Sequence, residues 1–313
     1  MAMKQRLIDE PGFAAQTSAF LERLSAMANA GRAGTQAARE QAPPTALSGQ
    51  ADPHVRVADL YLPARGGPVL TRVYQAADAS GRGPVLLWLH GGGFIAGSVY
   101  DLDHVCSRIS RLATVTVASL EYRLAPAHPF PAALHDTYDA MCWLAEHGTL
   151  LGGDGRLAAG GQSAGAALVA GATLMARDAA GPTLTSQVLC YPALDFGQDT
   201  ESVRLFNGVF LTIEPGGLVE KHYLGGQEPT GYAAPLRAES LAGLPPALVV
   251  GAGRDPLRDD ARAYARRLDR DGVDVTHVEY AGTMHGFMNF CGVLSAGDHA
   301  IDVIASDLRS TWQ

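Results

Sequence analysis

Short apolar runs alternate with amphipathic stretches along most of the chain. The apolar runs have the length and β-branched content of strands, and the stretches between them have helical spacing. The predicted strands are Val55–Leu62, Val69–Gln75, Val85–Leu89, Val115–Ser119, Leu157–Gly160, Gln187–Tyr191, Ala247–Val250 and Val273–Tyr280. The predicted helices lie at about 17–30, 103–112, 130–146, 164–177, 257–270 and 298–309. This alternation predicts an α/β fold with a mostly parallel, eight-stranded sheet flanked by helices.

The first two strands are an exception to the parallel pattern. Only a few residues around Arg65-Gly66-Gly67 separate them, which is the length of a hairpin connection. A parallel pair would need a crossover of a dozen residues or more. We therefore expect the sheet to begin with an antiparallel pair.

The strand and helix rhythm stops between Phe196 and about Ala234, where only a short helix at 218–223 is predicted. Long irregular insertions in compact domains are usually functional, so residues 196–234 are interpreted as a cap insertion. Residues 1–50 are Ala-rich and end in a polar connector, Gly31–Gln50, and are interpreted as an N-terminal cap segment. The α/β core then comprises residues 51–195 and 235–313.

Composition narrows the classes of partner and location. The net charge of −8 disfavours nucleic acid and anionic membranes as partners. No apolar run approaches the roughly 18 residues of a spanning helix, and the N-terminus lacks an apolar signal region. We therefore expect a cytoplasmic protein without stable membrane insertion. The four cysteines are scattered without CxxC pairs, which favours reduced thiols over disulfides or a metal site.

A candidate nucleophile lies in Gly161-Gln162-Ser163-Ala164-Gly165, a G-x-S-x-G pattern. An apolar strand precedes it and a long apolar helix follows, which is the context of a nucleophile elbow. The glycines permit a strained turn that presents the Ser163 hydroxyl at the helix N-terminus, where developing negative charge is favoured. The simpler alternative is that Ser163 only caps the helix.

A serine hydroxyl needs a base and a group that orients the base. In this type of fold the acid and then the histidine follow the serine along the chain. Asp255 follows the strand Ala247–Val250, although Asp-Pro also resembles the start of a helix, and Asp259 and Asp260 are rivals within that helix. His285 follows the last strand in a loop of small residues and fits as the base. His277, within the last strand, is expected on the surface.

Donors for an oxyanion are expected in His90-Gly91-Gly92-Gly93-Phe94, directly after a strongly apolar strand. Glycines there let backbone N–H groups point into a cleft without an obstructing Cβ. The N–H of Ala164 would be the remaining donor. A phosphate-binding loop is the weaker alternative, because the residues around it match neither nucleotide fingerprint.

These motifs together resemble the hormone-sensitive lipase family of esterases. The resemblance runs from about residue 60 to the C-terminus. It rests on His90-Gly91-Gly92-Gly93-Phe94, Glu121-Tyr122-Arg123-Leu124-Ala125-Pro126, Phe130-Pro131-Ala132-Ala133, Ser163-Ala164-Gly165, Leu244-Pro245-Pro246-Ala247, Asp255-Pro256-Leu257-Arg258-Asp259 and His285-Gly286-Phe287. It implies an α/β-hydrolase fold with a helical cap, a triad of Ser163, Asp255 and His285, and an oxyanion hole in the Gly91–Gly93 loop, with Gly92, Gly93 and Ala164 as donors.

Two positions depart from the family pattern. Gln162 stands where an acidic residue usually precedes the nucleophile, and Ala166 stands where a glycine usually follows the elbow. The first change removes a charge beside the site, and the second adds a methyl group at the start of the helix. Neither removes a triad member.

The expected activity is a carboxylesterase that hydrolyses short- to medium-chain esters through an acyl-enzyme, without metal or cofactor. The expected partner is a small-molecule ester, and a homodimer is a further expectation from the family. The cap residues around Phe206, Phe210, Leu211 and His222–Leu224 either line an acyl pocket or pack against the core. Two alternatives stay open: a binding protein like the gibberellin receptors, and an amidase, peptidase or lactonase on the same fold.

Overall fold

The computed structural model describes residues 3–30, 45–77, 83–197 and 199–312. Most of the expected connector, residues 31–44, lies outside these ranges.

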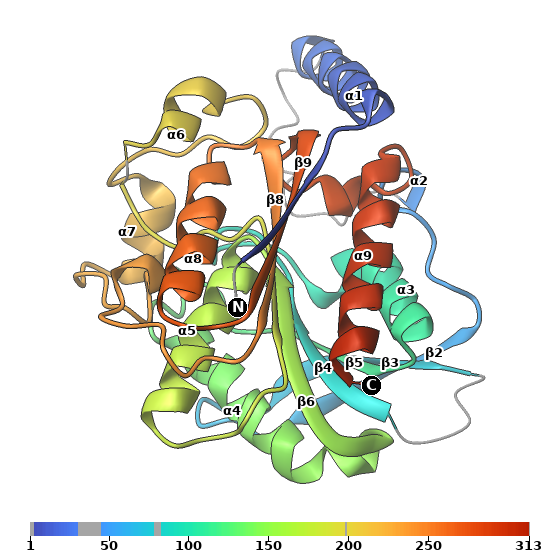
Figure 1. Cartoon of the computed structure of the whole chain (residues 1–313), viewed down its shortest axis with the longest axis vertical. Coiled ribbons are helices and arrows are strands. Elements are labelled where there is room, and N and C mark those ends of the chain that lie inside the picture. Colours follow the sequence, from blue (N-terminus) through green and yellow to red (C-terminus); the bar gives the residue numbers. More distant parts are fainter. Residues whose placement is uncertain (1–2, 31–44, 78–82, 198, 313) are drawn as a thin grey trace.

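One mixed sheet of nine strands crosses the described part of the chain, in the order β1-β9-β8-β7-β6-β4-β5-β3-β2 (Figure 1). Its strands are β1 (Lys4–Ile8), β2 (Val55–Leu62), β3 (Val69–Ala76), β4 (Gly83–Leu89), β5 (Thr116–Leu120), β6 (Gly153–Gln162), β7 (Gln187–Cys190), β8 (Ala247–Arg254) and β9 (Val275–Met284). Following the order of the sheet, neighbouring strands are parallel from β1 at one edge as far as β5. Strand β3 is antiparallel to both of its neighbours, β5 and β2. The predicted α/β fold and the antiparallel first hairpin are confirmed.

The ninth strand corrects the expectation of eight. Lys4–Ile8 was included in the N-terminal cap segment, but it pairs in parallel with β9 and forms the edge of the sheet. The segment is mostly polar and its side chains are mostly exposed. No apolar pattern therefore marks it as a strand. Its pairing partner lies some 270 positions later, which no local pattern can indicate.

Helices cover both faces of the sheet (Figure 1). They are α1 (Pro11–Ala30), α2 (Thr45–Ser48), α3 (Asp103–Ala113), α4 (Ala132–His147), α5 (Ala164–Asp178), α6 (Glu201–Phe206), α7 (Leu218–Leu224), α8 (Arg258–Arg270) and α9 (Ser295–Trp312), with short 3₁₀ turns η2 (Val99–Leu102), η3 (Gly148–Leu151), η4 (Pro235–Arg237) and η5 (Phe287–Phe290). Residues of α4, α5 and α8 share one core cluster, and residues of α3 and α9 share the other. The sheet therefore separates two apolar cores.

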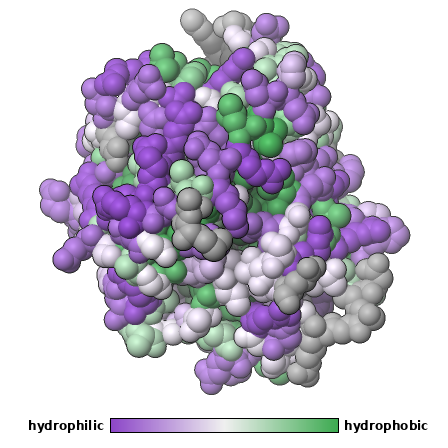
Figure 2. Space-filling view, viewed as in Figure 1, coloured by the Kyte–Doolittle hydropathy of each residue, from purple (hydrophilic) through white to green (hydrophobic). Residues whose placement is uncertain are grey.

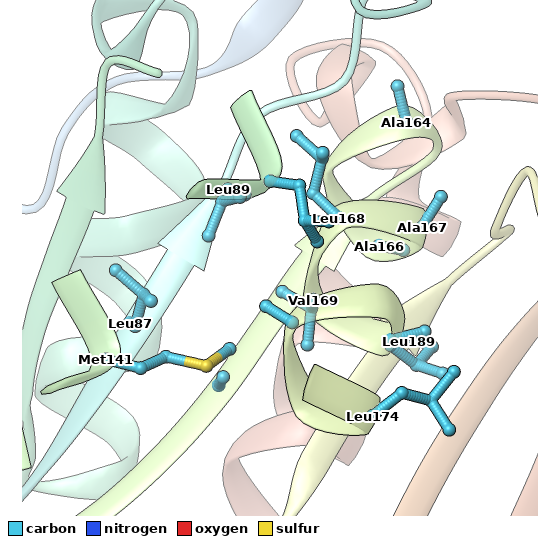
Figure 3. Packing of buried hydrophobic residues seen from close by; sticks show 14 of the residues in the cluster. Leu87, Leu89, Met141, Ala164, Ala166, Ala167, Leu168, Val169, Leu174 and Leu189 are labelled. Atoms are coloured by element: carbon cyan, nitrogen blue, oxygen red, sulfur yellow. The ribbon is translucent and has the colours of Figure 1, made fainter. Parts of the chain in front are cut away.

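Helix α5 lies close against the sheet because its inner positions carry small side chains. Ala166, Ala167 and Ala170 are buried, and they contribute with Leu168 and Val169 to the core that also contains Leu87 and Leu89 of β4 (Figure 3). Burial of this apolar surface contributes roughly 25 cal/mol for each Å² removed from water. The packing fixes the first turn of α5, and with it the residue that precedes the helix.

His277 is buried in β9, with 1% of its surface exposed, and not on the surface as its alternation with Glu279 suggested. Glu279 is buried as well, because Arg262 of α8 donates two hydrogen bonds of 2.7 Å to its carboxylate. Helix α8 thus covers the polar-looking face of the strand. Burial lowers the pKa of His277, so the neutral imidazole is favoured there.

Residues 196–234, interpreted from the sequence as a cap insertion, are attached to the core at both of their helices. At α6, the Ser202 hydroxyl donates to the Pro256 carbonyl (2.7 Å), and its backbone N–H donates to Asp259 (2.8 Å). At α7, the carbonyl of Tyr223 accepts the N–H of Phe130 (2.6 Å). The insertion therefore contacts the loop after β8 as well as the segment before α4.

Helix α1 lies at the carboxyl ends of β8 and β9 (Figure 1). Phe13 packs against Tyr280, and Ser18 accepts a hydrogen bond of 3.0 Å from Arg254. The outer surface shown in Figure 2 is mostly hydrophilic, with small separate apolar groups. In the described ranges, no helix combines the length and apolarity needed to cross a bilayer.

Candidate active site

Ser163 lies in the sharp turn between β6 and α5, with φ 54° and ψ −118°. Such a left-handed conformation is costly for a residue with a Cβ. The neighbouring glycines are required by close contacts: a Cβ on Gly165 would lie 2.3 Å from the His90 carbonyl oxygen, and one on Gly161 would lie 2.7 Å from Gly165. The Ser163 N–H donates to the Cys190 carbonyl (2.9 Å). The predicted elbow is present, and its strain is held by tight packing.

His285 joins the serine to the acid. Its Nε2 lies 2.9 Å from Ser163 Oγ, and its Nδ1 lies 2.7 Å from Asp255 Oδ2. Asp255 is fully buried and His285 is 7% exposed. Because a carboxylate accepts only, Nδ1 carries a proton and the lone pair of Nε2 faces the serine hydroxyl. This is the tautomer that a general base acting on Ser163 requires.

The second oxygen of Asp255 accepts the backbone N–H of Leu257 at 2.8 Å. The carboxylate is thereby fixed in the turn that precedes α8, so the capping interaction and the pairing with His285 coexist. The two rival acids point elsewhere. Asp259 binds the N–H of Ser202, and Asp260 binds the N–H groups of Leu194 and Asp195.

The glycine loop after β4 lies directly against the elbow. A Cβ on Gly91 would lie 3.3 Å from Ser163 Cβ, and one on Gly92 would lie 2.0 Å from the Ala96 carbonyl oxygen. Gly92 and Gly93 have φ values of 118° and 62°, which only glycine adopts without strain. Within the ranges that the structure describes, the N–H groups of these two glycines have no backbone acceptor. They are free to bind an oxyanion beside Ser163.

Packing around His90 supports this loop. Its imidazole stacks on Tyr122, with ring centroids 4.2 Å apart, and the Tyr122 hydroxyl donates to the His90 carbonyl (2.9 Å). His90 Nδ1 lies 2.6 Å from the Gly91 carbonyl oxygen. Burial lowers the pKa of His90 to about 4, so the ring is neutral at physiological pH and acts through its shape and hydrogen bonds.

Two cap residues approach the site from different sides. Val219 of α7 lies 3.4 Å from the point where a Cβ on Gly93 would sit, and Phe210 lies 3.9 Å from the corresponding point on Gly286, next to His285. Both side chains are about 40% exposed, whereas Tyr223 and Leu224 are buried. Tyr223 stacks on Phe94 (3.7 Å). Of the expected cap residues, Tyr223 and Leu224 therefore pack against the core, and Phe210 lies at the site.

Comparison with known proteins identifies the family of this chain. Residues 86–289 match the family model of the alpha/beta hydrolase fold. Esterase LipI of Mycobacterium tuberculosis is 38% identical over 79% of this chain and 80% of its own, and carboxylic ester hydrolase LipN of the same organism is 40% identical over 82% and 71%. A hyperthermophilic esterase from Pyrobaculum calidifontis is 42% identical, with a TM-score of 0.77 over 82% of this chain and 85% of its own.

The chain belongs to the hormone-sensitive lipase family of α/β-hydrolases.

One component of the site in this α/β-hydrolase has no counterpart in the sequence prediction. Tyr191 follows β7 in a left-handed conformation (φ 37°) and contacts the imidazole of His285 edge-on at 5.1 Å. Its hydroxyl donates to Oε1 of Gln162 (2.9 Å). The only local indication was the Tyr191-Pro192 pair at the end of an apolar strand, because the contacts themselves are long-range.

A possible set of metal ligands in this hydrolase lies elsewhere. Among the described residues, His104, Cys291 and Asp298 hold one nitrogen, one sulfur and one oxygen within 4.8 Å of one another. His104 Nε2 is already bonded to Asp298 Oδ1 at 2.8 Å, and Arg108 lies 3.5 Å from the same carboxylate. His104 and Arg108 of α3 thus already engage the carboxylate of Asp298 in α9, and the thiol of Cys291 donates to the Met288 carbonyl (3.1 Å). All four cysteines are free thiols.

Proposed function

We propose that this carboxylic ester hydrolase acts through a triad of Ser163, His285 and Asp255 and an acyl-enzyme intermediate, on esters with short to medium acyl chains. The observation that carries the proposal is the continuous pair of contacts from Asp255 to His285 (2.7 Å) and from His285 to Ser163 (2.9 Å). Esterase names among the family relatives support the class of reaction.

In the first half of the reaction, Ser163 Oγ attacks the ester carbonyl carbon while its proton passes to His285 Nε2. Asp255 holds the ring and stabilises the imidazolium that forms. The N–H groups of Gly92, Gly93 and Ala164 bind the oxyanion, and each such donor is typically worth about 2.7–4 kcal/mol of barrier stabilisation. Collapse of the tetrahedral intermediate breaks the bond to the alkoxy oxygen, which leaves as the alcohol with the proton from His285.

In the second half, His285 takes a proton from water as the water oxygen attacks the acyl-enzyme carbonyl. Collapse breaks the bond to Ser163 Oγ, which recovers the proton from His285 as the carboxylic acid leaves. The same donors bind the oxyanion of both tetrahedral intermediates.

The preference for short to medium acyl chains is supported by the cap. Val219 and Phe210 extend from the insertion to the oxyanion loop and to the loop of His285, which limits the space beside the reacting carbonyl. A series of p-nitrophenyl esters from C2 to C16 tests this preference, and a maximum at C16 would refute it.

The triad is tested with Ser163→Ala, which we expect to abolish turnover of p-nitrophenyl butyrate. Retention of near wild-type activity would refute the assignment. Labelling by a fluorophosphonate, which forms a covalent bond to the serine oxygen as fluoride leaves, is expected for the wild type and not for this variant. Matched ester and amide substrates separate the two activities. An esterase hydrolyses the ester and leaves the amide intact, whereas an amidase also hydrolyses the amide.

A further inference from the structure

Tyr191 lies between the three segments that carry the proposed triad. It directly follows β7, and its residual exposure is 1%. Its φ of 37° places a bulky residue in the left-handed region, which costs of order 1–3 kcal/mol and persists only where the surroundings enforce it. Such conformations cluster at functional sites, so the contacts of this residue are informative.

Three contacts of Tyr191 lead to the three segments that carry the triad. Its hydroxyl donates to Gln162, the residue before Ser163 (2.9 Å). Its ring meets the imidazole of His285 edge-on, with centroids 5.1 Å apart and an interplanar angle of 68°. Its backbone N–H donates to the carbonyl of Val250 (2.6 Å) in β8, the strand that leads to Asp255. One side chain and its backbone therefore contact all three segments.

Gln162 fixes the orientation of the tyrosine ring. The amide is fully buried, and its Nε2 has no hydrogen-bond partner in the described part of the chain. Its Oε1 can only accept, so the Tyr191 hydroxyl must be the donor. A buried amide with one of its groups unsatisfied is costly, typically by about 1–3 kcal/mol. The remaining hydrogen bond is therefore difficult to give up, and it holds the ring in place.

The imidazole is held at both nitrogens, by Asp255 at Nδ1 and by Ser163 at Nε2. The edge contact with Tyr191 adds a packing restraint, because T-shaped aromatic pairs have preferred geometries. The residue after His285 is Gly286, in a left-handed conformation (φ 72°). It has no side chain that could pack against the imidazole.

We propose that Tyr191, held by Gln162, is a positioning residue that keeps the imidazole of His285 in line with Ser163. This inference rests on the proposed function, because it assigns His285 the role of base. It concerns the proton transfer and not the binding of the ester. The rate of the chemical steps should therefore depend on Tyr191, while the affinity for substrate should not.

Two substitutions separate the hydroxyl from the ring. Tyr191→Phe keeps the ring and removes the bond to Gln162, and we expect kcat to fall about 5- to 10-fold. Tyr191→Leu removes the ring as well, and we expect a fall of roughly 100-fold, the size of effect that a misplacement of about 1 Å produces. KM should stay within about twofold in both variants, since only transition-state interactions are lost.

Tyr264 supplies the matched control. It is equally buried, in α8, and its hydroxyl has no partner among the described residues. Tyr264→Leu should lower the melting temperature to a similar extent as Tyr191→Leu, with kcat within twofold of the wild type. This comparison separates loss of positioning from general loss of packing.

A double-mutant cycle tests the role of Gln162. Gln162→Leu and Tyr191→Phe each remove one side of the same hydrogen bond, so the double variant should have a kcat close to that of the slower single variant. Multiplicative effects would overturn the link between the two residues. This cycle also stands if Tyr191→Leu fails to fold.

The outcomes distinguish this inference from the proposed function. Wild-type kcat in folded Tyr191→Leu, or a loss confined to KM, would overturn the positioning role alone. A wild-type protein that neither hydrolyses p-nitrophenyl butyrate nor is labelled by the fluorophosphonate would overturn both.

Discussion

Asp260 accepts a hydrogen bond of 3.0 Å from the backbone N–H of Leu194, although the two residues are 66 positions apart. The same carboxylate oxygen accepts the N–H of Asp195 at 3.2 Å. Asp260 belongs to α8 in the core, and its partners directly precede the cap insertion. This buried side chain therefore fixes the point where the insertion leaves the core.

Asp260 should make stability depend on pH. Burial raises its pKa to about 7, despite the two backbone hydrogen bonds that oppose the shift. Between about pH 4 and 7 the native state thus binds a proton that the unfolded chain has lost, so the free energy of unfolding falls as the pH rises through this window. The effect is on the order of a few kcal/mol at most. Asp260→Asn keeps an accepting oxygen and does not ionise.

Urea unfolding at several pH values between 4 and 8 measures this contribution. We expect the curve of stability against pH to be flatter for Asp260→Asn than for the wild type. Asp269→Asn, in the same helix, is the control and should retain the wild-type slope. Equal slopes for wild type and Asp260→Asn would show that Asp260 does not titrate in this range.

Gly92→Ala should reduce kcat strongly. The added Cβ would lie 2.0 Å from the Ala96 carbonyl oxygen at a φ of 118°, so the loop must move and its N–H groups lose their direction. Loss of one oxyanion donor typically costs about 10²- to 10³-fold in kcat. The measurement is kcat for p-nitrophenyl acetate at saturating substrate.

Gly67→Ala is a matched control for that loop. Gly67 has a similar φ of 110°, and nothing lies within 4 Å of its missing Cβ. The substitution should introduce backbone strain alone, with a lower melting temperature and an unchanged kcat. A kcat for Gly92→Ala equal to that of Gly67→Ala would argue against the oxyanion role.

The residues of the proposed triad were more predictable from the sequence than the residues that pack around them. Ser163 and the glycines around it form a local turn, whose geometry depends on residues adjacent in the chain. His285 and Asp255 were found by their positions after strands, and the structure brings both to Ser163. Tyr191 was not found, because its role depends on contacts with residues 29 and 94 positions away. Its sequence context is only an aromatic residue after an apolar strand.

In the fold, too, elements with a local sequence pattern were predicted, and features that depend on long-range contacts were missed. Periodicity identified eight strands and the helices between them, because each has its own apolar pattern. The edge strand Lys4–Ile8 is polar and gains its structure from pairing with β9. The burial of His277 was missed for a related reason: its face of β9 is covered by α8, whose Arg262 neutralises Glu279.

Truncation of Phe210 should broaden the range of esters that the enzyme accepts. The side chain is held on one side by Phe290, edge-on at 5.6 Å, and faces Gly286 on the other. Phe210→Ala would open the space beside His285, so kcat/KM should rise severalfold for bulky esters relative to p-nitrophenyl acetate. Leu205→Ala, an exposed apolar residue in α6, should leave this ratio unchanged. A ratio that shifts equally in both variants would assign the effect to the cap as a whole.

Asp255→Asn tests the orientation of the imidazole. An amide at this position can still accept the Leu257 N–H, but its NH₂ group can face His285 Nδ1 and favour the opposite tautomer. The Nε2 proton would then point at Ser163, and the base would be lost. We expect kcat to fall by about 10⁴-fold, as for the same exchange in serine protease triads, with little change in melting temperature. Asp259→Asn should instead weaken the attachment of Ser202 and lower kcat far less. Similar kcat values for the two variants would contradict the assignment of Asp255 as the triad acid.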